Sequence, residues 1–148
     1  MIIVLDFDGT CVTHEFPNLG RDIGAVPVLK KLVERGHKLI LWTMRSDGQE
    51  EKIIDGNPGN FLTQAVNWFK VNGIELYGIQ RNPTQDTWTT SPKCYAELYI
   101  DDAALGCPLL YPNNGERPYV NWMKVSSELE NMGLISHQDW IEIWKQSK

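Results

Sequence analysis

Two carboxylates, Asp6 and Asp8, stand one residue apart at the end of the first apolar run of the chain. That run, 2–5, is apolar and rich in β-branched residues without alternation, which predicts a strand buried on both faces. Gly9 then lets the backbone turn away. In open α/β sheets ligands bind beyond the carboxyl ends of strands, and burying two acids there is unfavourable without a cation. The pair therefore predicts a metal ion and a reaction with a carboxylate nucleophile.

The elements that must position these acids alternate along the chain. Apolar runs predict further strands at 39–42, 75–79 and 98–100, and a short edge strand at 109–111. Helical spacing predicts helices that begin near Pro27, cover 61–69 and 120–132, and open at Ser136. This order favours right-handed crossovers in a parallel sheet. We expect one α/β domain over 1–148, Rossmann-like and three-layered, with helices on both faces of the sheet.

Polar groups follow three of the predicted strands. Thr43 ends the second strand, and Asp101 and Asp102 end the fourth, with Lys93 shortly before it. Because the carboxyl ends of parallel strands share one edge of the sheet, we expect these side chains to converge on Asp6.

These residues carry a family resemblance. The run Asp6-Phe7-Asp8-Gly9-Thr10 resembles the first signature of the haloacid dehalogenase superfamily, most of whose members are Mg²⁺-dependent phosphatases. The second, third and fourth signatures are resembled, in this order, by Thr43, by Lys93 and by the pair Asp101-Asp102. The resemblance covers residues 1 to about 105.

The resemblance implies a role for each of these residues. Asp6 is the nucleophile that forms a phosphoaspartyl enzyme, and Asp8 is the general acid and base. Thr43, the backbone N–H of Met44, and Lys93 hold the phosphate. Mg²⁺ is bound by Asp6, the Asp8 carbonyl and Asp101, with Asp102 bound directly or through water.

Elementary chemistry agrees with those roles. Mg²⁺ prefers oxygen ligands and commonly sits on a few carboxylates and a substrate phosphate. Like charges this close raise the pKa of at least one carboxyl group, so a protonated Asp8 beside an ionised Asp6 suits phosphoryl transfer. Structural roles remain open: the aspartates can cap turns or helices, Thr43 can make a structural hydrogen bond, and Lys93 can be a solvated surface lysine.

Three neighbours have two interpretations each. Arg45 either reaches the leaving group or forms a surface ion pair, and the ion pair is favoured. His14 lies in the polar stretch 11–24, which we expect to form a flap, and it either touches substrate or is uninvolved. Trp88 either walls the site or packs within its loop.

Composition limits the partners. The formal net charge is −5, and no basic stripe is present, so nucleic acid is not expected as a partner. Three cysteines without metal-like spacing favour a reduced, cytoplasmic setting. We expect no signal peptide and no membrane span.

The intervals between the signatures leave no room for a cap domain, so we expect an open site. The sequence therefore predicts a Mg²⁺-dependent hydrolase that acts on a small phosphomonoester. A homo-oligomer is one arrangement that would shield the open site. A 5'-nucleotidase-like phosphatase of the same superfamily and a catalytically idle phosphate-binding or regulatory module are the alternatives. The physiological substrate is not specified by the sequence.

Overall fold

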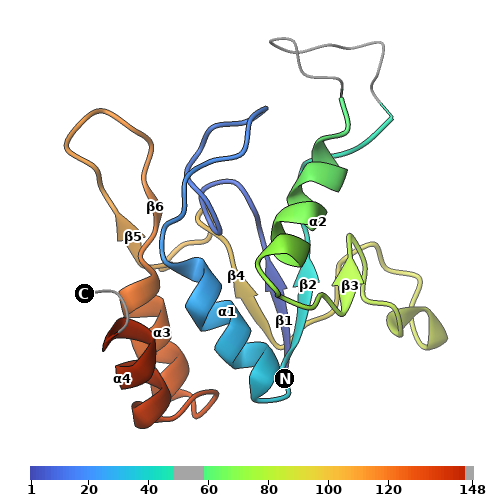
Figure 1. Ribbon diagram of the computed structural model, residues 1–148. Coiled ribbons are helices and arrows are strands. Elements are labelled where there is room, and N and C mark those ends of the chain that lie inside the picture. The colour runs from blue at the N-terminus through green and yellow to red at the C-terminus, as the bar shows by residue number, and fades with distance from the viewer. Residues whose placement is uncertain (49–58, 146–148) are drawn as a thin grey trace.

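The computed structural model describes residues 1–48 and 59–145. Its centre is a parallel sheet in the order β3-β2-β1-β4 (Figure 1). The strands are β1 (Ile2–Leu5), β2 (Lys38–Leu41), β3 (Gly78–Ile79) and β4 (Leu98–Ile100). The predicted parallel α/β sheet is confirmed, although β3 is shorter than the run 75–79.

Within the described residues four α-helices pack against this sheet, and each lies where the apolar spacing predicts one. They are α1 (Ala25–Glu34), α2 (Phe61–Val71), α3 (Trp122–Asn131) and α4 (His137–Lys145). α1 begins at Ala25, ahead of Pro27, and buries Val28, Leu29 and Leu32 against the sheet. A single apolar stripe of this kind is what fixes a helix on a sheet.

The arrangement of the layers differs from the prediction of helices on both faces. Ile3 and Leu5 of β1 point into the main core, to which all four α-helices contribute. Val4 and Ile40 point to the opposite face, where they meet Cys94. That face is crossed by the segment 80–97, whose only described helical element is the 3₁₀ turn η1 (Gln85–Thr87).

The strand order explains this one-sided packing. The steps from β1 to β2 and from β2 to β3 run in the same direction, so right-handed crossovers place α1 and α2 on the same face (Figure 1). Only the return from β3 to β4 crosses the other face, and it is made without an α-helix. The carboxyl edge of that face is consequently left open.

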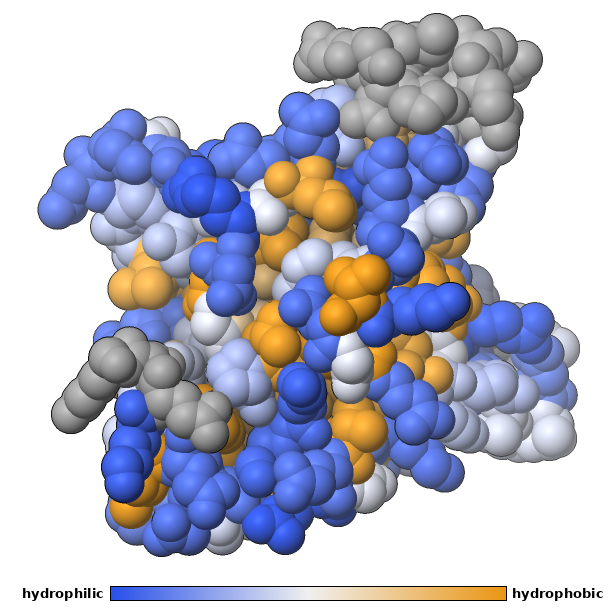
Figure 2. Space-filling view, in the orientation of Figure 1, coloured by the Kyte–Doolittle hydropathy of each residue, from blue (hydrophilic) through white to orange (hydrophobic). Residues whose placement is uncertain are grey.

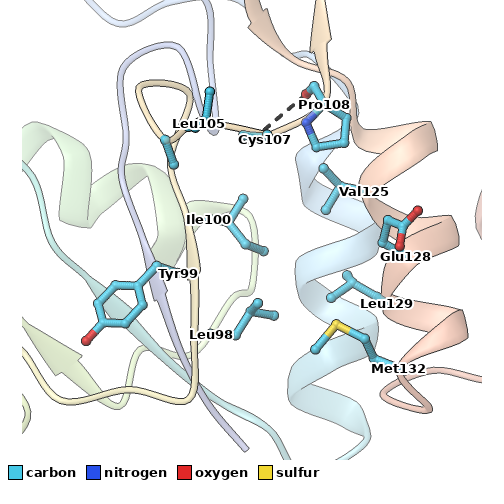
Figure 3. Close-up of a pocket in the computed structure, with 12 residues that line it drawn as sticks. Leu98, Tyr99, Ile100, Leu105, Cys107, Pro108, Val125, Glu128, Leu129 and Met132 are labelled. Atoms are coloured by element: carbon cyan, nitrogen blue, oxygen red, sulfur yellow. Dashed lines mark hydrogen bonds between the residues drawn. The ribbon is translucent and has the colours of Figure 1, made fainter.

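The predicted edge strand at 109–111 also needs correction. Leu109–Leu110 forms β5, but it pairs antiparallel with β6 (Tyr119–Val120) in a separate two-stranded sheet. β4 therefore ends the main sheet, and an apolar cavity of about 240 Å³ lies between it and α3 (Figure 3). Leu98 and Ile100 point into this cavity toward Val125 and Leu129, whereas Tyr99 points away from it.

Hydrophilic side chains cover most of the helical face of the molecule, and apolar ones show in separate patches (Figure 2). Each helix within the described residues is too short or too polar to span a membrane.

Candidate functional site

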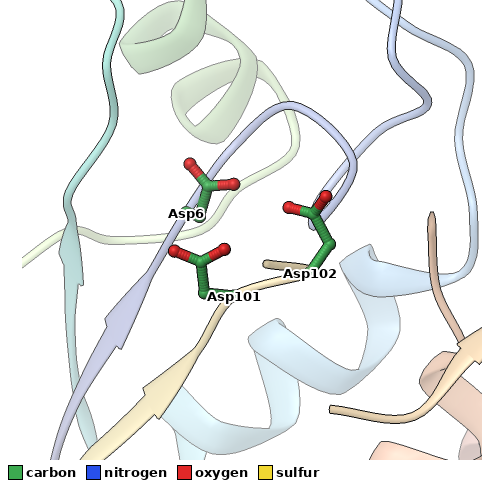
Figure 4. Close-up of side chains that lie close together, drawn as sticks. All are labelled: Asp6, Asp101 and Asp102. Carbon is green, nitrogen blue, oxygen red and sulfur yellow. The ribbon is translucent and has the colours of Figure 1, made fainter. Parts of the chain in front are cut away.

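Three carboxylates meet at the carboxyl edge of the main sheet. Asp6 follows β1, and Asp101 and Asp102 follow β4, its direct neighbour in the sheet (Figure 4). One carboxylate oxygen from each of the three lies within 4.8 Å of the other two. The backbone N–H of Asp6 donates to the Ile100 carbonyl at 3.1 Å, which fixes the two strand ends side by side. The convergence predicted from the parallel sheet is found for these residues.

Side chains of the first loop hold this acidic cluster in place. The Thr10 hydroxyl lies 3.2 Å from Asp6 Oδ2 and 3.1 Å from Asp102 Oδ1, and it accepts the Asp102 N–H. His14 Nε2 lies 3.0 Å from Asp102 Oδ2. Gly9 has φ +80°, and a Cβ there would lie 2.0 Å from His14 Nε2, so only glycine fits. The stretch expected to form a flap thus contacts the acids through His14.

Burial and the neighbouring carboxylates change the protonation of Asp6. Burial raises the pKa of Asp6 to about 8, helped by the hydrogen bond with Asp102 and by the negative charges of Asp101 and Asp102. Desolvation and like charges both disfavour the ionised acid. At neutral pH and without a cation, protonation of Asp6 is therefore favoured, which differs from the expectation that Asp6 is the ionised member of the pair with Asp8.

The same three residues fit a hard divalent cation. Oxygen ligands on opposite sides of Mg²⁺ are about 4 Å apart, since each metal–oxygen distance is about 2.0–2.1 Å. One oxygen from each of Asp6, Asp101 and Asp102 lies within 4.8 Å of the other two, so the three can reach one ion, and the negative charges of Asp101 and Asp102 add to burial in raising the pKa of Asp6. Carboxylates with room for water and a substrate phosphate suit Mg²⁺.

A cavity of about 270 Å³ opens beside Asp6 and connects it to the end of β2. Asp6, Trp42, Thr43, Met44 and Asp101 line it. Thr43 and Met44, predicted as phosphate ligands, are therefore next to the predicted nucleophile. This brings the first, second and fourth of the predicted polar sites together.

Gln80 supports this cavity and was missed by sequence reasoning. Its side-chain carbonyl accepts the Thr43 N–H at 2.8 Å, and its amide donates to the carbonyls of Thr43 and Arg45 at 2.6 and 3.1 Å. Its φ of +62° is unusual for a residue other than glycine. Gln80 directly follows β3, so the rule that polar residues at strand ends belong to the site could have found it.

Asp8 is held by an arginine that the sequence suggested as a surface residue. Arg45 is only 2% exposed and donates to both Asp8 carboxylate oxygens at 2.8 Å. It also donates to the Asn18 carbonyl at 2.9 Å and lies 5.1 Å from the Phe7 ring. The favoured surface ion pair is therefore a buried one, because the Arg45 side chain turns toward Asp8 and the stretch 11–24 rather than outward.

Lys93 and Trp88 lie apart from the cavity beside Asp6. Lys93 is exposed, and its Nζ lies 5.9 Å from the centre of the Tyr99 ring. Trp88 is 63% exposed and packs edge-to-face with Tyr95. Neither side chain lines the cavity. The predicted phosphate contact of Lys93 thus stays a prediction.

The parallel sheet, its crossovers and the polar groups at its carboxyl edge define an α/β protein of Rossmann-like fold. No known family profile and no protein of curated function matches the chain. A solved structure does: the conserved protein coded by a locus of Bacteroides thetaiotaomicron matches with a TM-score of 0.64 and 30% identity. The match covers 94% of this chain and 95% of that one, so the chain belongs to the same family as that protein.

Proposed function

We propose that this protein is a Mg²⁺-dependent phosphatase of the haloacid dehalogenase type, which hydrolyses a phosphomonoester through a phosphoaspartyl intermediate on Asp6. The observation that carries the proposal is the cavity that joins Asp6 to Thr43 and Met44, directly beside Asp101 and Asp102. In this arrangement the nucleophilic carboxylate of Asp6 and the phosphate-binding residues Thr43 and Met44 line the same cavity, as phosphoryl transfer requires.

The first half-reaction transfers the phosphoryl group to the enzyme. The Asp6 carboxylate attacks phosphorus, the bond to the leaving oxygen breaks, and Asp8 gives its proton to that oxygen. Thr43 and the Met44 N–H orient the phosphoryl oxygens meanwhile. Mg²⁺ bound by Asp6, Asp101 and Asp102 would supply positive charge to the phosphoryl oxygens and favour the ionised nucleophile.

The second half-reaction is hydrolysis of the phosphoaspartate. Asp8 takes a proton from water, the resulting hydroxide attacks phosphorus, and inorganic phosphate leaves as Asp6 is regenerated. Arg45 uses one lone pair on each Asp8 oxygen, so a second lone pair on each stays open to water or to the leaving group. The guanidinium also fixes the direction of the Asp8 carboxyl group through its two hydrogen bonds.

The Arg45 contact also favours a second candidate. If Asp8 stays locked against the guanidinium, no acid reaches the leaving group, and the protein is a catalytically idle phosphate-binding or regulatory module. A 5'-nucleotidase-like activity remains an alternative substrate class within the phosphatase proposal.

Hydrolysis of a chromogenic aryl phosphate tests the proposal. We expect activity with Mg²⁺, loss of activity on chelation, and a decrease of about 1,000-fold or more in Asp6→Asn. The matched control is Asp86→Asn, which removes an exposed carboxylate paired with Arg81 and should keep full activity. After rapid quenching, mass spectrometry should find the phosphoryl group on the peptide that contains Asp6.

Activity without metal, or an unaffected Asp6→Asn variant, contradicts the phosphoaspartate mechanism. Absence of hydrolysis together with calorimetric binding of inorganic phosphate supports the idle module instead.

A further inference from the structure

Two aromatic side chains lie on the open face of the sheet, next to the acidic cluster. Trp42 is 38% exposed and Tyr99 is 37% exposed. Their ring centres are 6.2 Å apart with an interplanar angle of 52°. Tyr99 points away from the cavity between β4 and α3, on the side where the described residues place no α-helix (Figure 3). The pair is thus not part of the main core.

The sheet register places this pair at the predicted nucleophile. Leu5 is opposite Leu41 on one side and Ile100 on the other, so the next residues, Asp6, Trp42 and Asp101, form one row across three strands. The backbone N–H of Trp42 donates to the Leu5 carbonyl at 2.8 Å, which extends the hydrogen bonding between β1 and β2 to this row. Side chains in one row of a parallel sheet point to the same face. The indole therefore lies on the same side of the sheet as the Asp6 carboxylate.

Trp42 also shares the cavity with Asp6. The walls of that cavity are acidic at Asp6 and Asp101 and apolar at Trp42 and Met44, whose side chain is 97% exposed. Single exposed apolar residues on a protein surface need no explanation. An indole and a thioether that line the same cavity as the half-buried Asp6 carboxylate are different, because a molecule bound in that cavity lies within reach of all three.

We propose that Trp42, backed by Tyr99, binds a planar aromatic group in the leaving half of the substrate, so that the preferred substrates are aryl-bearing or nucleobase-bearing phosphomonoesters. This inference rests on the proposed phosphatase function. An aromatic ring gains stacking energy on the indole beyond the burial of its area, whereas a saturated group of equal size gains only the burial. Aromatic rings also contact methionine sulfur favourably, which suits Met44.

Two phosphomonoesters of matched size and reactivity test this inference. Benzyl phosphate and cyclohexylmethyl phosphate both release a primary alcohol, and only the first carries an aromatic ring. We expect a higher kcat/KM for benzyl phosphate, and a loss of about 5-fold in that preference in Trp42→Leu. Trp42→Phe keeps an aromatic face and should keep most of the preference. The matched control is Trp88→Leu, which removes an exposed tryptophan outside the cavity and should change nothing.

A second pair of substrates distinguishes nucleobases from simple aryl groups as the aromatic part of the leaving group. Adenosine 5'-monophosphate and ribose 5-phosphate share the reacting alcohol and differ by the base. A Trp42-dependent preference within this pair identifies nucleobases as ligands, and a preference confined to benzyl phosphate identifies simple aryl groups.

Binding of phosphonates separates failure of this inference from failure of the proposed function. Benzylphosphonate and cyclohexylmethylphosphonate are not hydrolysed, and calorimetry with Mg²⁺ present measures their affinity directly. Hydrolysis of both phosphates with an equal preference in wild type and Trp42→Leu overturns the aromatic site and leaves the phosphatase standing. No hydrolysis, but tighter benzylphosphonate binding that depends on Trp42, supports the aromatic site and overturns the phosphatase. Equal affinity for the two phosphonates overturns the aromatic site in either case.

Discussion

At the scale of single residues, the buried pair of Arg45 and Asp8 is the contact that most constrains the chemistry. Arg45 is almost completely removed from solvent, and the Asp8 side chain is 18% exposed. A bidentate contact between a guanidinium and a carboxylate fixes both groups in direction as well as in distance. Within the proposed reaction Arg45 is a positioning residue for Asp8, since it acts on the substrate only through that carboxylate.

Removal of the Arg45 charge should be costly for stability. Arg45→Met leaves Asp8 without its buried partner, and we expect the free energy of unfolding to fall by about 3 kcal/mol in urea denaturation. Arg81→Met is the control, because it breaks the exposed pair with Asp86 and should cost less than about 1 kcal/mol. Equal losses in the two variants would show that the Arg45 pair is not effectively buried. In Arg45→Lys, a changed pH profile of kcat with an unchanged KM would identify the positioning role.

Asp6 should release a proton when a cation binds. Its pKa of about 8 lies above neutral pH, so the acid is mostly protonated in the metal-free protein at pH 7 and mostly ionised at pH 9. A cation needs the ionised form. We expect Mg²⁺ binding to release close to one proton at pH 7 and few at pH 9, with affinity rising between these values.

Calorimetry in buffers of different ionisation enthalpy measures this release. The control is Asp6→Asn, for which the pH dependence of proton release should disappear. The same release at pH 7 and pH 9 in the wild type would contradict the raised pKa of Asp6.

At the scale of the elements, α4 is fastened to α1 through one buried carboxylate. Asp139 is 1% exposed, accepts the Ser136 N–H at 3.0 Å, and receives the Arg35 guanidinium at 2.9 and 2.5 Å. The Ser136 hydroxyl in turn accepts the Asp139 N–H at 3.0 Å, and the two contacts form a capping box at Ser136, where the sequence predicts that this helix begins.

Asp139→Asn should destabilise the fold in a pH-dependent way. The Arg35 guanidinium holds the pKa of Asp139 well below its usual range of about 3.9. Because the folded pKa is the lower one, the stabilisation is present above about pH 4 and is lost as the pH falls below it. We expect Asp139→Asn to lower the free energy of unfolding by about 1–3 kcal/mol at pH 7 and by less at pH 3.

Thermal unfolding at several pH values measures this difference. Glu142→Gln on the same helix, whose carboxylate lies 3.7 Å from Lys31 at the surface, is the control and should change little. A loss in Asp139→Asn that is independent of pH would contradict the charge-based explanation.

At the scale of the whole molecule, the C-terminal half holds the first loop in position. Trp122, the first residue of α3, is 1% exposed, and its indole N–H donates to the Thr10 carbonyl at 2.7 Å. Thr10 is the residue whose hydroxyl contacts Asp6 and Asp102. The acidic cluster is thus coupled to an element far away in the sequence.

Trp122→Phe should weaken cation binding as well as stability. The variant leaves the buried Thr10 carbonyl without its partner, which costs about 1–3 kcal/mol. We expect a lower melting temperature and a several-fold weaker Mg²⁺ affinity by calorimetry. Trp144→Phe removes a comparable indole hydrogen bond, to the Ser126 hydroxyl, away from the acids, and should lower stability alone. Unchanged Mg²⁺ affinity in Trp122→Phe would show that the loop is positioned without Trp122.

Much of the architecture follows from the sequence by itself. Apolar runs without alternation, such as 2–5 and 39–41, are typical of strands buried in a parallel sheet, and residues at the carboxyl ends of such strands share an edge. For this reason the meeting of Asp6, Asp101 and Asp102, and the position of Thr43 beside them, were predictable. The periodic stripes of α1 and α2 likewise determine those helices without knowledge of their partners.

The tertiary structure alone decided which face of the sheet each helix covers, and what the polar side chains contact. The burial of Arg45 against Asp8, the support of Thr43 by Gln80, and the place of Trp42 beside Asp6 depend on strand order and register between segments far apart in sequence. Residue type and spacing report local geometry, whereas such contacts are set by the packing of the whole chain. A charged residue in a loop therefore looks solvated in the sequence until the fold closes over it.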